Sequence, residues 1–161
     1  MIRGALLIWV AMFLTACASP DIFPQSVVSE MEANKDLVQM GGQIITAQKQ
    51  DGVQVVAEKL PIRHDDPRQG PDDNARPQGW FMVSFGGNIE ELGLMYGNKF
   101  IAIGKLEGTQ VAEVDGLKRE VPNLVTQCLH VWKTGREKIE NFPHVKDGYY
   151  PLPRQTYCKL K

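Results

Sequence analysis

The three cysteines, Cys17, Cys128 and Cys158, carry the most reactive side chains of the sequence. Cys17 ends the box Leu14-Thr15-Ala16-Cys17, which follows a short run without charge. A positive start, an apolar run and small residues at the cut are typical of an export signal. In this box the thiol can be alkylated by a diacylglyceryl group before cleavage, and the new α-amine acylated afterwards, for example with palmitate. The pattern predicts a lipoprotein signal peptide over residues 1–16 and lipid attachment at Cys17.

The apolar run is too short to span a bilayer, which takes about 20 residues. Two or more acyl chains would hold the protein firmly, at about 0.8 kcal/mol per buried CH₂ group, whereas one chain binds reversibly. The alternative is a secreted protein in which Cys17 is a chance thiol. Ala18 and Ser19, not aspartate, follow the cut, and in bacterial lipoprotein sorting this points to the outer membrane. We therefore expect a lipid-anchored protein of the outer membrane that faces the periplasm and has membrane lipid as its partner.

Cys128 and Cys158 form an even pair in a chain predicted to be exported, so we expect a disulfide between them. The bond would close a loop of about 31 residues, which the chain-entropy relation values at roughly 3.5 kcal/mol. The alternative is a redox-active or metal-binding pair of thiols. No Cys-x-x-Cys spacing supports that alternative.

The cluster His64-Asp65-Asp66 is the strongest local candidate for acid–base or metal chemistry. A metal site needs three or four converging ligands, and arginines interleave the nearby aspartates. We interpret the cluster as part of a solvated polar loop over residues 61–78. His130 is interpreted as a hydrogen-bonded structural residue on the same strand face as Leu124, Cys128 and Trp132.

Other signatures of enzymes are weak. Ser84 lacks the Gly-x-Ser-x-Gly context of a hydrolase nucleophile. Gly41-Gly42 and Gly86-Gly87 lack the Lys-Ser/Thr sequel of a phosphate loop, and His144 lies in a polar tail. We therefore predict no catalytic residues, no metal, no cofactor and no enzymatic activity.

Composition and charge indicate one globular domain. Hydrophobic residues make up 43% of the chain, and the formal net charge is −1. Without a stripe of lysine or arginine to neutralise phosphates, nucleic acid is a poor candidate partner. The predicted organisation is a signal peptide over residues 1–16, a tether over residues 17–25 and a single domain with a C-terminal tail over residues 26–161.

Short β-branched runs between glycine-rich turns predict the fold. One or two helical turns are expected at residues 24–33, a turn at Asp51-Gly52 and another turn at Glu107-Gly108. Strands are expected at residues 37–49, 53–60, 79–85, 98–106, 109–114 and 122–133. This pattern favours a mainly β fold, a small antiparallel OB-like β-barrel. A β-sandwich is the second choice.

Trp80, Phe81 and Phe85 lie on one predicted strand. They could form a stacking platform, but burial in the core is favoured. Tyr149, Tyr150 and Tyr157 are expected to cover one end of the barrel.

A series of short motifs follows Cys17. They are residues 36–45 (DLVQMGGQII), Leu60-Pro61, residues 79–82 (GWFM), residues 97–108 (GNKFIAIGKLEG) and residues 130–132 (HVW). In order and spacing, this series resembles the Slp family of outer-membrane lipoproteins between Cys17 and Trp132. Gln39-Met40 departs from the family pattern, and Cys128, Cys158 and the tail are not part of the resemblance. The resemblance implies an envelope lipoprotein linked to starvation or stress, and it implies no catalytic residues.

Three functions remain as hypotheses. The first is an outer-membrane lipoprotein with a non-enzymatic structural or interaction role in the envelope. The second is a periplasmic OB-like domain that binds a peptide, glycan or lipid in a groove between the loop over residues 61–78 and the aromatic strand. The third, least favoured, is a hydrolase or metal enzyme that uses His64 and its neighbouring carboxylates.

Overall fold

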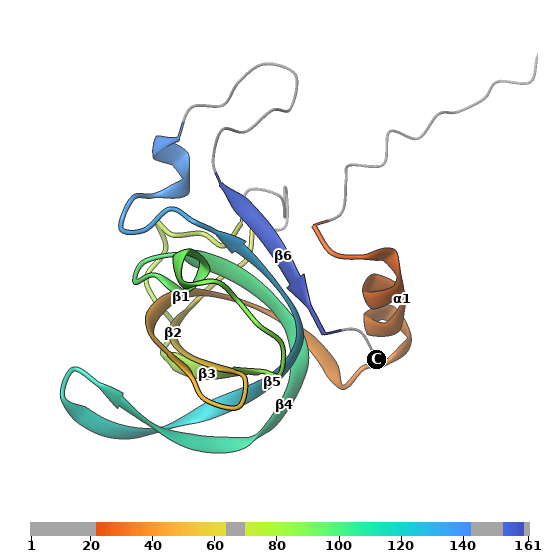
Figure 1. Cartoon of the computed structure of the whole chain (residues 1–161), viewed down its shortest axis with the longest axis horizontal. Helices are drawn as coiled ribbons and strands as arrows, with labels where there is room; N and C mark the ends of the chain where they lie inside the picture. Colours follow the sequence, from red (N-terminus) through yellow and green to blue (C-terminus); the bar gives the residue numbers. More distant parts are fainter. Residues whose placement is uncertain (1–21, 64–69, 143–152, 160–161) are drawn as a thin grey trace, which may run out of the picture.

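The computed structural model describes residues 22–63, 70–142 and 153–159 of the 161-residue chain (Figure 1). Several residues singled out above lie outside this part: Cys17, His64, Asp65, Asp66, His144, Tyr149 and Tyr150. The described residues form six strands, one α-helix and two short 3₁₀ helices. In chain order these are α1 (Gln25–Ala33), β1 (Leu37–Lys49), β2 (Val53–Leu60), β3 (Trp80–Phe85), η2 (Glu91–Leu94), β4 (Lys99–Val114), β5 (Leu117–Trp132), η3 (Ile139–Asn141) and β6 (Arg154–Cys158).

All six strands belong to one sheet, which confirms the mainly β prediction. The pairs β1–β2, β2–β3, β1–β4 and β4–β5 are antiparallel. A parallel pairing of β3 with β5 closes the ring β1–β2–β3–β5–β4. β6 adds antiparallel to β5, beyond the residues that pair with β3. The single sheet differs from the two facing sheets of the sandwich alternative.

The predicted hairpin of β1 and β2 is confirmed, with Lys49 opposite Val53. Its turn places Asp51 at φ 50° and Gly52 at φ 112°. A β-carbon on Gly52 would lie 2.6 Å from the carbonyl oxygen of Phe85, so this position requires glycine. The predicted helix is also present as α1, directly after Pro24.

The main hydrophobic core lies inside the ring. Phe81 and Phe100 meet there with ring centroids 5.9 Å apart. Both side chains are almost fully buried, as are Ile44, Val55, Val83, Leu124 and Leu129. Because successive side chains of a strand point to opposite faces, one face of each strand points into this core.

The turn predicted at Glu107-Gly108 is wrong. β4 continues through both residues to Val114, and Gly108 (φ 64°) lies within an irregularity of the β4–β5 register. The chain turns at Asp115-Gly116, where both residues have positive φ. In a long strand, a glycine can mark a bulge as well as a turn. Gly108 lies at such an irregularity, not at a turn.

The predicted face of Leu124 is also wrong. Ile103 pairs with Cys128, but the next residue, Gly104, pairs with Thr126. Gln127 is therefore the extra residue of a bulge, and it reverses the alternation of β5. Leu124 packs inside the ring, whereas Cys128 and Trp132 belong to a cluster on its outer side.

The first described residues already pack on the body of the domain. Phe23 is 6% exposed, although it lies in the segment predicted as a tether. Among the described residues, no helix is both long and apolar enough to cross a membrane.

Candidate functional site: the docked N-terminal segment

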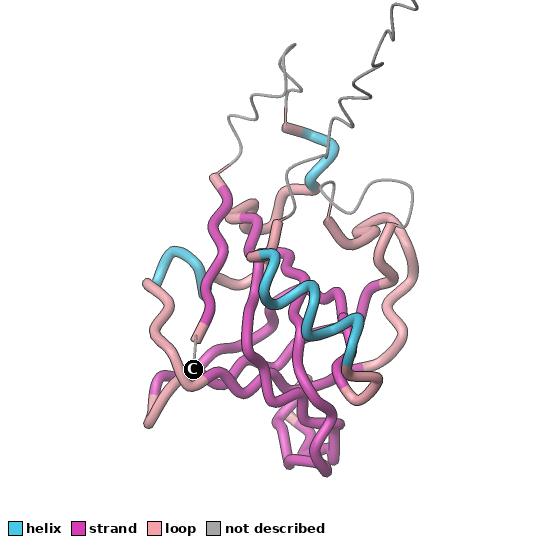
Figure 2. Tube along the Cα trace, turned by 90° about the vertical axis from the view of Figure 1, so that its right-hand side faces the viewer, coloured by secondary structure: helices cyan, strands magenta, loops and turns pink. Residues whose placement is uncertain are grey.

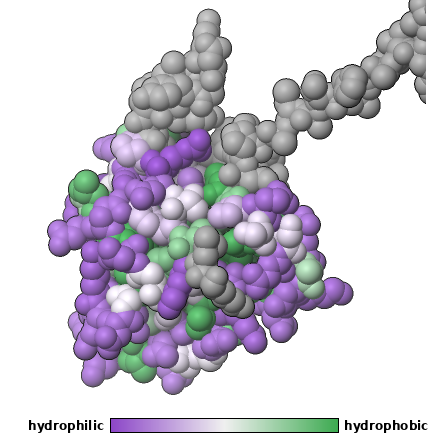
Figure 3. Space-filling view, turned by 45° about the vertical axis from the view of Figure 1, so that its right-hand side comes forward, coloured by the Kyte–Doolittle hydropathy of each residue, from purple (hydrophilic) through white to green (hydrophobic). Residues whose placement is uncertain are grey.

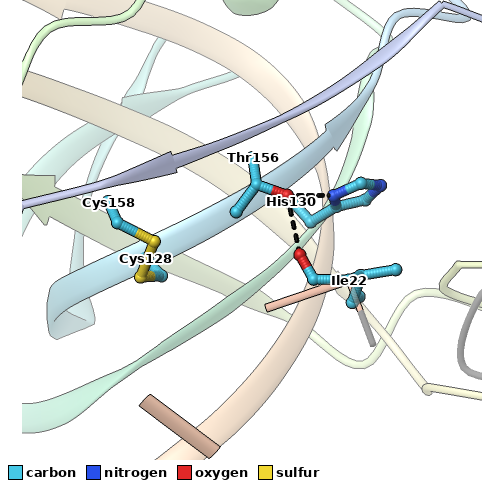
Figure 4. The surroundings of a disulfide bond; sticks show 5 residues. All are labelled: Ile22, Cys128, His130, Thr156 and Cys158. Atoms are coloured by element: carbon cyan, nitrogen blue, oxygen red, sulfur yellow. Dashed lines mark hydrogen bonds between the residues drawn. A yellow bond between two sulfur atoms is a disulfide. The ribbon is translucent and has the colours of Figure 1, made fainter. Parts of the chain in front are cut away.

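The site is built on the pairing of β5 with β6. Cys128 lies opposite Cys158, Leu129 opposite Tyr157, and His130 opposite Thr156. Because side chains alternate along a strand, Leu129 and Tyr157 point into the core of the ring, while the other two pairs face outward. Figure 4 shows these outward pairs beside Ile22, the first described residue.

The first outward pair is covalent. Cys128 and Cys158 form a disulfide with a sulfur–sulfur distance of 2.01 Å across 30 residues of sequence. The side chain of Cys128 is fully buried, and Cys158 is half-buried. The bond ties the five-residue β6 to the long β5, so the short strand need not rely on its backbone hydrogen bonds alone.

The second outward pair binds the N-terminal segment. The Thr156 hydroxyl lies 2.7 Å from the carbonyl oxygen of Ile22 and 2.7 Å from Nδ1 of His130. A hydroxyl has one proton, and the carbonyl can only accept it. Thr156 therefore donates to Ile22, and His130 donates its Nδ1–H to Thr156. This assigns the Nδ1–H tautomer to His130.

His130 is neutral in this arrangement. The pKa of its imidazole falls to about 4 because burial disfavours the charged form and because Arg154 adds a nearby positive charge. Its Nε2 is buried and has no hydrogen-bond partner among the described residues, which a lone pair tolerates better than an N–H group would. The ring of Trp132 lies edge-on to the imidazole of His130, with the two ring centroids 4.4 Å apart. His130 is thus the buried, hydrogen-bonded residue expected from the sequence.

Apolar contacts complete the dock. Phe23 and Val27 of the N-terminal segment are buried against the outer faces of β4 and β5. Their cluster includes Ile101, Ile103, Cys128, Trp132 and Ile139. Full burial of one such side chain contributes about 1.5–3 kcal/mol, so Phe23 and Val27 outweigh the single hydrogen bond to Ile22. We call Ile22, Phe23, Val27, His130 and Thr156 the N-terminal dock.

A second set of contacts holds β6 from the other side. The Tyr157 hydroxyl donates to Glu90, and Lys133 forms an ion pair with the same carboxylate. Burial works to raise the pKa of Glu90, but the hydrogen bonds from Lys133 and Tyr157 outweigh it and lower this pKa to about 2. The pKa of Tyr157 is raised by burial and by its bond to Glu90. The connection before η2 is thereby joined to β6.

The polar loop over residues 61–78 packs against the segment around η3. Asp73 accepts a 2.9 Å hydrogen bond from the backbone N–H of Ile139, and Asn74 donates to Glu140 at 2.9 Å. Ile62 and Pro71 form an isolated bridge. The described ends of this loop are therefore fixed on the domain.

Lys99 is a buried charge that the sequence analysis missed. It is 2% exposed, and its ammonium donates to the carbonyl oxygens of Gly135 (3.0 Å) and Glu137 (2.5 Å). Burial lowers its pKa, against the opposing charges of Asp73 and Glu137. A lysine at the start of an apolar strand hints at burial of its side chain. The carbonyl groups that bind it lie 36 and 38 residues away in sequence, so a local reading does not reveal them.

A groove of about 460 Å³ lies between the outer face of β1–β3 and the β4–β5 hairpin. Its lining includes Thr46, Gln48, Gln54, Val56, Met82, Val111, Glu113 and Asp115. Met82 of the aromatic strand lines this groove, and none of the described residues of the loop over residues 61–78 does. Phe81 and Phe85 are buried in the core. The guanidinium carbon of Arg119 lies over the ring of Trp80, 4.7 Å from the ring centroid.

The described catalytic candidates are hydrogen-bonded to polar groups that are neither general bases nor metal ligands. Ser84 donates a 2.8 Å hydrogen bond to Asn123, so its hydroxyl is engaged by an amide and not by a base. Among the described residues, no group of three or more His, Cys, Asp or Glu side chains could hold a metal ion. The cluster at His64 lies outside the described residues.

These features define a disulfide-stapled, mainly β domain whose first described residues are docked on its last strand. Residues 14–158 match the outer membrane lipoprotein Slp family, and the chain belongs to that family. It is thus an outer-membrane lipoprotein. The match begins at Leu14, the first residue of the cysteine box, and extends past Trp132 to include β6. No curated protein and no solved structure shows a significant match to the chain.

Proposed function

We propose that this protein is held by lipid on Cys17 with its domain facing the periplasm, and that it acts without catalysis as a structural or interaction module of the stressed envelope. The observation that carries the proposal is the N-terminal dock. Phe23 and Thr156 hold the N-terminal segment on the domain. The domain therefore lies close to the group that attaches the preceding residues to the membrane. The cysteine box five residues before Ile22 supplies that attachment.

Membrane fractionation of Cys17→Ser tests the anchor. We expect the wild-type protein in the outer-membrane fraction and the variant outside it, because the serine hydroxyl cannot take the thioether-linked lipid. Ser19→Ala, which leaves the box intact, is the matched control and should fractionate as wild type. Co-fractionation of Cys17→Ser with the outer membrane would reject lipid anchoring at this residue.

A ligand-binding role is the second candidate, supported by the groove beneath the β4–β5 hairpin. The ring order β1–β2–β3–β5–β4 with a parallel β3–β5 pair supports an OB-like barrel, in which such a face commonly binds ligands. The lining combines apolar Val56 and Met82 with the amides of Gln48 and Gln54, which suits a peptide better than a stacked base.

Photo-crosslinking in living cells separates the two roles. A photoreactive residue at Val111 lies in the groove, and one at Leu92 lies outside it, while the two native side chains are 61% and 63% exposed. Specific capture from position 111 but not from position 92 supports a ligand in the groove. Equal or no capture from position 111 would leave the structural role as the proposed function.

A further inference from the structure

The position of the dock limits how far the domain can move from its point of attachment. Five residues separate Cys17 from Ile22, and an extended chain spans at most about 3.3–3.6 Å per residue. The lipid-bearing cysteine therefore lies within about 18 Å of Ile22. Because Phe23 is buried and Ile22 is bonded to Thr156, the domain cannot lengthen this reach without breaking the dock.

Exposed polar residues lie beside the dock, together with the half-buried hydrophobic side chains of Ile22, Val28 and Met31. Pro24 and Gln25 are exposed at the start of α1, and Arg154 adds a positive charge on the same side of β6 as Thr156. The visible part of the face that carries α1 is mostly hydrophilic, with small separated hydrophobic areas (Figure 3). Such a surface suits the headgroup layer of a bilayer and not its hydrocarbon core.

The groove lies at the other side of the ring. In Figure 1 the start of the described chain lies at the right of the ring, between β6 and α1, and the tip of the β4–β5 hairpin projects at the lower left. In Figure 2 the hairpin projects at the bottom. The two views are at right angles, so the separation is not an effect of projection. A domain resting on its docked side presents the hairpin and the groove away from the lipid.

We propose that the surface formed by Pro24, Gln25, Arg154 and Thr156 rests against lipid headgroups, and that the groove beneath the β4–β5 hairpin points into the periplasm. This inference rests on the proposed lipid anchor. It adds to the anchor a fixed orientation, which an anchor on a free tether would not impose. The dock, through Phe23 and Thr156, supplies the orientation.

Fluorescence quenching in vesicles tests this orientation. The lipidated protein is reconstituted in phosphatidylethanolamine–phosphatidylglycerol vesicles that contain a headgroup spin-labelled lipid. A fluorophore is attached to Gln25→Cys or, as the distal control, to Leu117→Cys, which replaces a 58% exposed side chain on the hairpin. With Cys17 acylated and Cys128 bonded to Cys158, the introduced cysteine is the free thiol.

We expect the spin-labelled lipid to quench the probe at residue 25 strongly and the probe at residue 117 hardly at all. Thr156→Val, which removes the hydroxyl but keeps the shape, should reduce the difference between the two probes. Equal quenching at both positions, or stronger quenching at residue 117, would overturn the orientation.

Mass spectrometry of the same preparation separates this inference from the proposed function. If Cys17 is acylated and quenching is equal at the two positions, the orientation is wrong and the anchor stands. If Cys17 carries no acyl chain, the anchor and the orientation are both wrong.

Discussion

Thr156 in the last strand donates a hydrogen bond to the carbonyl oxygen of Ile22, at 2.7 Å and across 134 residues of sequence. The same hydroxyl accepts from His130, and the Cys128–Cys158 disulfide joins β6 to β5 at the neighbouring outward pair of this antiparallel ladder. The C-terminal strand thus holds the first described residues of the chain.

Replacement of Thr156 by valine should lower the free energy of unfolding by about 1–2 kcal/mol, because a part-buried carbonyl and a buried Nδ1–H lose their partner. Thr156→Ser keeps the hydroxyl and should recover most of the loss. Denaturant unfolding of the three proteins measures both effects. Equal stability of Thr156→Val and wild type would contradict the role given to the hydroxyl.

His130 should make stability depend on pH. Its pKa is about 4 in the folded protein, below the ordinary value near 6.5, so the unfolded chain binds more protons between these values. Stability is therefore complete above pH 6.5 and falls as the pH drops toward 4, by up to about 3 kcal/mol from this group. The measurement is the free energy of unfolding between pH 4.5 and 7.5. His130→Gln should show a flatter curve, and parallel curves would exclude His130 as the titrating group.

The disulfide should survive purification without reductant. Because Cys128 is buried, thiol labelling is done in denaturant, where a free thiol at either position would react. We expect no labelling without reductant and labelling at both positions with it. The double variant Cys128→Ala/Cys158→Ala should lose roughly 3–4 kcal/mol of stability, through release of the closed loop. Labelling of both cysteines before reduction would show that the bond is absent.

Lys99→Met should destabilise the protein by about 2–3 kcal/mol, since the carbonyl groups of Gly135 and Glu137 lose a charged donor. Lys105→Met is the matched control, because Lys105 is an exposed lysine on the same strand. Its effect should stay within about 0.5 kcal/mol. Thermal unfolding compares the two, and similar melting temperatures would argue against a structural role for the Lys99 ammonium.

Local signals account for the parts of the fold that the sequence predicted. Asp51-Gly52 between two alternating runs located the β1–β2 hairpin, and Pro24 before an amphipathic segment located α1. These features depend on neighbours in sequence. Turn chemistry and side-chain alternation are visible there without any knowledge of the rest of the fold.

Long-range contacts account for the parts that were missed. Gln127 carries no sign that it is a bulge, and yet it decides which face Leu124 takes. Arg154–Cys158 is a strand because Tyr157 enters the core and Cys158 is bonded to Cys128, and neither contact can be read from a polar pentapeptide. The hydrogen bond from Thr156 to Ile22 joins residues 134 positions apart in sequence, so the dock has no local signature.

Lipid at Cys17 is the central proposal, and intact mass spectrometry of protein extracted from outer membranes tests it most directly. We predict a chain that begins at Cys17 and carries a diacylglyceryl group on the thiol and an acyl chain on the α-amine. A chain that still begins at Met1, or one that begins at or after Cys17 without acyl groups, would contradict it.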